Sequence, residues 1–103
     1  MAKLSIVAAP TFKAPVSIPI AGSAPVDVEF TFKHRTKDEM TAFLASREGL
    51  SDAQSLLEMV AGWDFAEPFT PESVEKMLQN YLGAAVNVYV KYIDELTKAK
   101  AKN

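Results

Sequence analysis

The chain has 103 residues, of which 49% are hydrophobic and 23% charged, a composition typical of a single soluble globular domain covering residues 1–103. Its net charge of -2 argues against nucleic acid as the main partner, because a phosphate-binding domain needs a basic face. The absence of cysteine excludes disulfides and thiolate chemistry, and the single histidine excludes histidine-rich zinc sites.

The apolar start MAKLSIVAAP superficially suggests a secretory signal. Lys3 is followed by a few apolar residues, but the run is interrupted at Ser5 and stops at Pro10, which is too short for a secretory core. Elsewhere no stretch approaches the roughly 20 apolar residues needed to cross a bilayer. The sequence therefore predicts a cytoplasmic protein with an intact start and no membrane partner.

Alternating side chains predict strands in the first third of the chain. Residues 4–7 are the first candidate. Over residues 16–20 apolar side chains alternate with Ser17 and Pro19, and Pro19, which lacks an N–H, belongs at a sheet edge. The clearest strand is VDVEFTFK, residues 26–33, in which apolar side chains face one way and polar ones the other. The turn sequence AGSAP between these two strands predicts a hairpin.

Four helices are expected after the strands. Thr36 with Glu39, and Ser51 with Gln54, have the form of capping boxes, in which each side chain satisfies a backbone N–H of the other residue. The third start, TPE at residues 70–72, combines a cap, a proline at the first helical position and an acid in the first turn. The last helix is expected over about residues 84–100.

Glycines indicate where these helices end. The first helix is expected to end with Gly49 in the left-handed conformation. The apolar spacing continues the second helix through Val60 and Ala61, so that Gly62 ends it. Gly83 allows a break before the last helix. The lysines expected to suit the C-terminal dipole of the last helix are Lys98, Lys100 and Lys102.

Together these patterns predict an α+β fold. An N-terminal antiparallel β-hairpin or three-stranded sheet in residues 1–35 is followed by three to four helices in residues 36–103. The sequence contains no internal repeat and no low-complexity tract that would divide the chain further.

No residue pattern points to catalysis. His34 and Asp38 lie close together in sequence, but a catalytic histidine also needs a nucleophile in reach, and no serine elbow or triad spacing accompanies them. The acids show neither calcium-loop nor HExxH spacing, and the four glycines stand singly rather than in a phosphate-binding loop. The chain is therefore expected not to be an enzyme and to bind no cofactor or metal.

The last helix, with the sequence AAVNVYVKYIDEL, is apolar over more than one face. In one interpretation Val88 and Tyr92 cover the sheet while Tyr89 and Ile93 meet the other helices. In the other, the surplus apolar surface serves self-association or a partner helix laid in a groove.

The connector GWDFAEPFTPES holds the one tryptophan of the chain. Trp63, Phe65 and Phe69 either form a corner packed between helices or anchor an interface, because tryptophan and tyrosine are frequent anchors. The candidate partner-binding residues are Trp63, Phe65, Phe69, Val88, Tyr89 and Tyr92.

The order of these parts resembles the tail assembly chaperones of long-tailed bacteriophages and prophages. The resemblance rests on VDVEFTFKHRT followed by TKDEMTAFL, and on VAGWDFAEPFTPESVEKMLQNYLGAAVNVYVKYIDEL with a stop at KAKAKN. It covers most of the chain and is strongest over residues 60–103. Members often have a tryptophan before an acidic residue, then an apolar turn, a helix start and an aliphatic-tyrosine helix. The matching positions are Trp63, Asp64, Phe69, Tyr81, Tyr89 and Ile93.

The resemblance implies a non-catalytic protein of the host cytoplasm that is absent from the mature virion. Such proteins bind the long, hydrophobic tape-measure protein, keep it soluble and help to recruit tail-tube subunits around it. In many relatives a ribosomal frameshift near the end of the gene yields a longer form whose extension contacts the tube protein. The final Ala-Lys-Asn is compatible with a slippery codon sequence, and equally with a solvated helix end.

Two rival functions remain open at this stage. One is a structural tail component, such as a tube or connector subunit, that stays in the virion. The other is a small enzyme or ligand-binding domain that uses His34, Asp38 and a cleft under the sheet.

Overall fold

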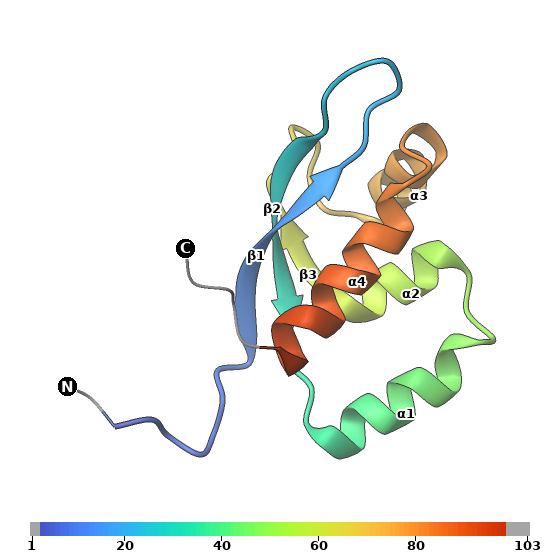
Figure 1. The fold of residues 1–103 in the computed structure, drawn as a ribbon. Helices are drawn as coiled ribbons and strands as arrows, with labels where there is room; N and C mark the ends of the chain where they lie inside the picture. Colours follow the sequence, from blue (N-terminus) through green and yellow to red (C-terminus); the bar gives the residue numbers. More distant parts are fainter. Residues whose placement is uncertain (1–2, 99–103) are drawn as a thin grey trace.

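The computed structural model describes residues 3–98, and over this range the chain forms an α+β fold of three strands and four helices (Figure 1). Their order is β1 (Thr11–Ile18), β2 (Val26–Lys33), α1 (Lys37–Arg47), α2 (Asp52–Met59), β3 (Val60–Trp63), α3 (Pro71–Asn80) and α4 (Ala84–Thr97). The predicted fold class is thus confirmed. None of the helices in the described range combines the length and apolar character that a membrane span requires.

The predicted hairpin is confirmed, although its first strand is Thr11–Ile18 rather than residues 16–20. Strands β1 and β2 pair antiparallel from Thr11 opposite Lys33 to Ile18 opposite Val26. The turn between them includes Gly22 at φ 77°, a left-handed conformation that glycine adopts without a Cβ clash. Pro19 follows the last residue of β1, the edge strand, so it removes no N–H from the ladder.

The third strand lies where the sequence predicts the end of a helix, so the helical assignment of Val60 and Ala61 is wrong. Helix α2 ends at Met59, and Val60 pairs with Phe32 of β2. An irregularity in the register then leaves Ala61 as an extra residue before Gly62 pairs with Thr31. The free edge of β2 and the burial of Val60 in the core outweigh the helical spacing of the side chains.

The predicted strand at residues 4–7 does not form. These residues pair with no other strand, and all their side chains are exposed, including Leu4, Ile6 and Val7. The neighbouring outer edge of β1 is instead approached by α4, where the Asn87 side-chain amide donates to the Ser17 carbonyl at 2.8 Å.

Local capping accounts for the helix starts, as predicted. The Thr36 and Ser51 capping boxes are both complete, and Thr70 accepts from the backbone N–H of Ser73 ahead of a proline at the first turn. Gly49, however, is not left-handed, because α1 ends in a right-handed residue followed by tight turns. The break expected at Gly83 is confirmed.

The last helix ends earlier than predicted. Thr97 is its final residue, and Lys98 is already extended. The expected helical positions beyond it, Lys100 and Lys102, and the final Ala-Lys-Asn lie outside the described residues.

The helices cover one face of the sheet, and the core lies between these two layers (Figure 1). Side chains of β1 and β2 that face the helices are buried, whereas those on the opposite face, such as Lys13, Asp27 and Glu29, are exposed. Helix α4 packs along β1, and its start lies so close to Pro19 that a Cβ on Gly83 would meet the proline ring at 2.9 Å. The close approach at Gly83 thus fixes how α4 enters the helical layer.

Candidate protein-binding site

The tryptophan corner is built at the junction of β3 and the loop that leads to α3. Trp63 ends β3, and its indole meets three phenylalanine rings edge to face. The ring centroids are 6.2 Å from Phe30, 4.8 Å from Phe65 and 5.1 Å from Phe69. Because Phe30 is fully buried in β2, these contacts connect the loop to the hydrophobic core.

Hydrogen bonds hold the loop around the indole. The Trp63 Nε1–H donates to the Glu67 carbonyl at 2.8 Å, which satisfies the polar edge of the ring. The Asp64 backbone N–H donates to the Glu29 carbonyl at 2.9 Å and extends the sheet contact by one residue. The corner is therefore a packed joint, as one of the two interpretations expected, with Trp63 left half-buried.

A pocket of about 330 Å³ opens on the outer side of this joint, between the loop and α3. Its aromatic and apolar lining is Trp63, Phe65, Met77 and Tyr81. Its polar lining is Glu67, Ser73, Lys76 and Asn80. An apolar wall with polar groups around it is the usual form of a site that takes an apolar side chain from a peptide or protein.

Helix α3 and the residue that caps its end supply one side of the pocket. Ser73 and Met77 lie four residues apart on α3, and Lys76 and Asn80 occupy the neighbouring row. Tyr81 is the extended C-cap of the helix. Met77 is only 5% exposed, so it forms the floor. Methionine is flexible enough to adapt to differently shaped side chains.

The predicted binding residues of α4 lie elsewhere and face inward. Val88 and Tyr92 are 0% exposed, so neither offers surface to a partner in this conformation. The Tyr92 ring lies against Phe32 of β2, with centroids 5.4 Å apart, and its hydroxyl donates to the Lys33 carbonyl at 2.7 Å. The interpretation in which Val88 and Tyr92 cover the sheet is therefore the one that fits.

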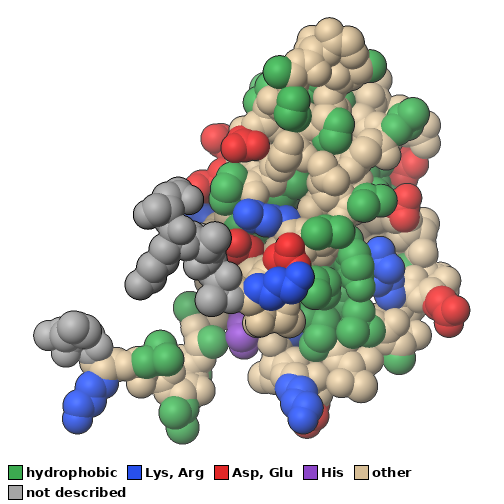
Figure 2. Space-filling model, viewed as in Figure 1, with side chains coloured by type: hydrophobic (Ala, Val, Ile, Leu, Met, Phe, Trp, Pro, Cys, Tyr) green, Lys and Arg blue, Asp and Glu red, His purple; other side chains and the backbone are tan. Residues whose placement is uncertain are grey.

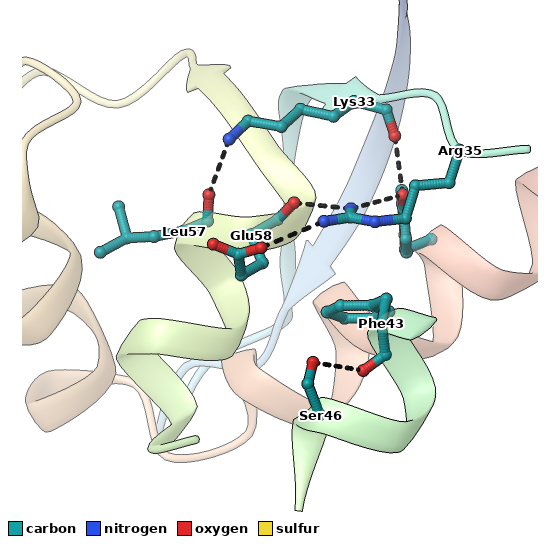
Figure 3. A network of polar contacts seen from close by, with 7 residues as sticks. Lys33, Arg35, Phe43, Ser46, Leu57 and Glu58 are labelled. Carbon is teal, nitrogen blue, oxygen red and sulfur yellow. Dashed lines mark hydrogen bonds and ion pairs between the residues drawn. The ribbon is translucent and has the colours of Figure 1, made fainter. Parts of the chain in front are cut away.

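Arg35 connects the end of the sheet to two helices (Figure 3). Its guanidinium donates to the Glu58 carbonyl at 2.6 Å and to the Tyr92 hydroxyl at 3.0 Å, and it pairs with the Glu58 carboxylate at 3.3 Å. The same group lies 4.5 Å from the centroid of the Phe43 ring. Nearby, the Lys33 ammonium donates to the Leu57 carbonyl at 3.1 Å, also shown in Figure 3.

Tyr89 lies one residue around α4 from Val88 and is half-buried on the side that faces the other helices. The Arg47 guanidinium of α1 lies 3.6 Å from the centroid of its ring, within the range of a cation–π contact. Figure 2 shows hydrophobic side chains gathered on this face, over the region where α4, α2 and α1 converge in Figure 1. The half-buried apolar residues of these three helices are Met40, Ala53, Leu57, Tyr89, Ile93 and Leu96.

The structure thus divides the six predicted site residues between three places. Trp63 and Phe65 line the pocket, and Phe69 supports Trp63 from outside it. Tyr89 lies under α1, and the remaining two, Val88 and Tyr92, are in the core.

Sequence reasoning assigned neither Met77 nor Tyr81 to this site, although it named Tyr81 as a position matching the family. The available signal was their spacing of four residues, with Met77 on a helix that begins directly after the aromatic loop and Tyr81 at its C-cap.

The two residues considered for catalysis, His34 and Asp38, belong to different segments of the fold. His34 follows β2, where its backbone N–H donates to the Pro10 carbonyl at 2.9 Å. Asp38 is exposed in the first turn of α1. Among residues 3–98, no group of three or more histidine, aspartate or glutamate side chains could hold a metal ion.

Comparison with known proteins places the chain in a family. No curated protein and no solved structure gives a match. The model of one family, described as phage tail assembly chaperone, matches residues 1–103, in agreement with the resemblance seen in the sequence. The chain therefore belongs to the phage tail assembly chaperone family.

Proposed function

We propose that this protein binds the tape-measure protein of a phage tail and keeps it soluble during tail assembly in the host cytoplasm. The observation that carries the proposal is the pocket walled by Trp63, Phe65, Met77 and Tyr81 in a member of a tail assembly chaperone family. A long helical client exposes apolar side chains at regular intervals, and an aromatic pocket with a polar rim suits one such side chain.

The chemistry of the rim supports a helical ligand that is apolar on one side only. Glu67 and Lys76 carry opposite charges, and Ser73 and Asn80 offer neutral hydrogen-bonding groups. A ligand with polar groups flanking its apolar anchor can therefore keep those groups paired while the anchor is desolvated. The pocket is small, so binding is expected to be weak and reversible, as a transient assembly step requires.

Tail-tube recruitment forms the second half of the proposal. While the tape-measure protein is held, the same complex helps to bring tube subunits to it, and the chaperone then leaves. Mass spectrometry of purified mature particles should therefore find no peptide of this chain. Its presence there in stoichiometric amount would favour a structural tail component instead.

The binding proposal is tested by co-expression with the tape-measure protein. The soluble fraction of the client should rise with the wild-type chain. A Tyr81→Asp variant, which brings a charge into the pocket, should lose most of this effect. The matched control is Leu82→Asp, because Leu82 is the next residue, is 86% exposed and does not line the pocket.

The outcomes distinguish an error in the proposed function from an error in the proposed binding site. If the client is as insoluble with the wild-type chain as without it, the proposed function is wrong. If both variants keep the client soluble, the function stands but the pocket is not where it binds. Circular dichroism establishes that each variant is folded, and the emission of Trp63, the one tryptophan of the chain, reports directly on the pocket wall.

A further inference from the structure

We propose that α1 is a displaceable helix, and that the face of α4 beneath it, formed by Tyr89 and Tyr92, is a second site for an apolar client helix. Only the identity of that client as a tail protein rests on the proposed function. The displacement of α1 rests on how the helix is attached.

Helix α1 is held to the rest of the molecule by few side chains. Of its eleven residues only Phe43 is buried, Met40 and Arg47 are half-buried, and the other eight are exposed. In Figure 1 it lies at one end of the molecule, beyond α2 and α4. An element with so little buried apolar surface belongs to the part of a protein that opens locally without global unfolding.

The elements that keep α1 helical do not depend on this attachment. The Thr36 and Glu39 capping box is internal to α1 and its first turn, with bonds of 2.8 and 3.2 Å between the two residues. The connections on either side, residues 34–36 and 48–51, contain no helix or strand. The helix can therefore move away as a unit, turning at the backbone between Arg35 and Thr36 on one side and at residues 48–51 on the other.

Two residues of α1 cover the tyrosines of α4. The Phe43 ring meets Tyr92 edge to face at 6.2 Å between centroids, and the Arg47 guanidinium covers the Tyr89 ring. Positions 43 and 47 are four residues apart and so lie on one side of the helix. Removing α1 would uncover an edge of Tyr92 and the outer face of Tyr89.

The uncovered surface would be organised in advance. Tyr92 stays fixed by the sheet and by its hydroxyl bond to the Lys33 carbonyl, neither of which involves α1. Arg35 also stays in place, because Glu58 and Tyr92 hold its guanidinium, and it would face whatever replaces Phe43. A preformed surface requires little further ordering when a ligand binds.

The present occupant indicates the chemistry of the ligand. A site that accepts a helix with a phenylalanine and an arginine four residues later should accept another helix with a large apolar residue and a cation at that spacing. The cation would lie over Tyr89 and the apolar side chain against Tyr92 and Arg35. The client is therefore a helix with an aromatic or aliphatic residue followed at i+4 by arginine or lysine.

Hydrogen exchange of the full-length protein, followed by NMR, tests the displacement. Amides of α1 should exchange at least about tenfold faster than those of central α4, corrected for intrinsic rates. Phe43→Ala should speed exchange in α1 by a further tenfold or so, and α1 should still exchange faster than central α4. Leu44→Ala, at an adjacent side chain that is 44% exposed, is the matched control and should leave α1 nearly unchanged.

Equal protection of α1 and α4 in the wild type would overturn the inference, because α1 would then open only with the whole molecule.

The binding half is tested with a synthetic peptide of residues 36–48, the sequence TKDEMTAFLASRE, added to the Phe43→Ala protein. The ring signals of Tyr89 and Tyr92 should shift, with at least about tenfold tighter binding than to the wild type, whose own α1 competes. A peptide carrying Phe43→Ala should bind neither protein. If the intact peptide leaves both tyrosine signals unmoved, the second site does not exist.

These experiments are independent of the pocket near Trp63. The peptide should leave the Trp63 indole signal unchanged, because that residue lies in the corner between β3 and α3. A failure of the tape-measure co-expression with displacement intact would remove the proposed function alone. A failure of the exchange experiment with client solubility intact would remove only the role of α1.

Discussion

Helices α1 and α4 pack against each other through Phe43 and Tyr92 but are attached to the molecule in different ways. In α4 three side chains are buried, and only Val86, Val90 and Thr97 are exposed. In α1 one side chain is buried, and the helix contacts α4 through the Phe43 ring on Tyr92 and the Arg47 guanidinium on Tyr89. A helix can thus be well formed by its own caps and still be weakly attached to the core.

The difference follows from where each helix finds apolar surface. Helix α4 packs along β1 and against α2, and its Val88 and Tyr92 fill the space over the sheet. Helix α1 follows β2 in the chain and lies beyond the space that Val88 and Tyr92 fill over the sheet. The main interaction that holds α1 to the core is therefore the burial of Phe43, which contributes about 1.5–3 kcal/mol. Weaker cation–π contacts add to it.

The largest change in stability should come from removing Tyr92, the α4 residue against which Phe43 of α1 packs. Tyr92→Ala should lower the free energy of unfolding by about 3–5 kcal/mol, because it leaves a cavity among the rings and an unpaired Lys33 carbonyl. Urea denaturation measures this change. Val90→Ala, on the same helix but 46% exposed, should stay within about 0.5 kcal/mol. Similar losses for both variants would contradict the view that α4 is anchored through Tyr92.

Arg35→Ala should have the next largest effect, a loss of about 1–3 kcal/mol in global stability. The guanidinium is 15% exposed in the ion pair, and its loss leaves the Glu58 carbonyl without this donor. Glu58→Gln is the control, since it keeps the backbone carbonyl and removes only a carboxylate that is 56% exposed. That variant should cost less than about 1 kcal/mol. A reversed order of the two would mean that the ion pair, rather than the carbonyl contact, holds this junction.

Arg47→Ala should have a smaller effect. It removes the cation over Tyr89, worth about 0.5–1 kcal/mol, and should speed amide exchange in α1 while lowering the free energy of unfolding by no more than about 1 kcal/mol. Lys37→Ala, at an exposed position of the same helix, should change neither quantity. A shift in the urea midpoint as large as that of Arg35→Ala would show that α1 is as firmly integrated as α4.

The smallest expected effect is a pH dependence of the α1 cap. Hydrogen bonds from the Thr36 backbone N–H, and then from its side chain, lower the pKa of Glu39 below its ordinary value. Because the folded pKa is the lower one, the carboxylate stabilises α1 above the ordinary glutamate pKa, and this stabilisation is lost as the pH falls through the lowered pKa of the folded state. The Thr36 amide shift in NMR spectra should follow this titration.

Glu39→Gln is the matched variant for that titration. Glutamine can keep the capping geometry but has no carboxyl group to protonate, so the acid dependence of the Thr36 amide should disappear. A titration that persists unchanged in this variant would assign it to another group.

The features that the sequence predicted correctly are those encoded within a few residues. Both capping boxes and the proline start of α3 satisfy backbone groups locally, so residue type and spacing suffice to place them. The alternation of residues 26–33 likewise depends only on one wet and one buried face. The hairpin turn around Gly22 belongs to the same class.

The errors arise where a distant partner decides the conformation. Val60 continues a helical pattern, yet pairing with Phe32 makes it a strand residue. Residues 4–7 have strand-like side chains but no strand to pair with. For the same reason the sequence singled out Trp63 and Phe65 but none of the pocket residues on α3. The loop places Trp63 and Met77 in one pocket lining in a way that no local spacing encodes.

The amide of Asn87 on the Ser17 carbonyl has a consequence for the behaviour of the protein in a crowded assembly reaction. Pro15 lies two residues away and so presents the same outer border of β1, where it offers no N–H. An extended chain that paired with this edge would therefore lack two hydrogen-bond partners, the Ser17 carbonyl and an N–H at position 15. The outer edge of β1 is in this way protected from strand addition by another chain.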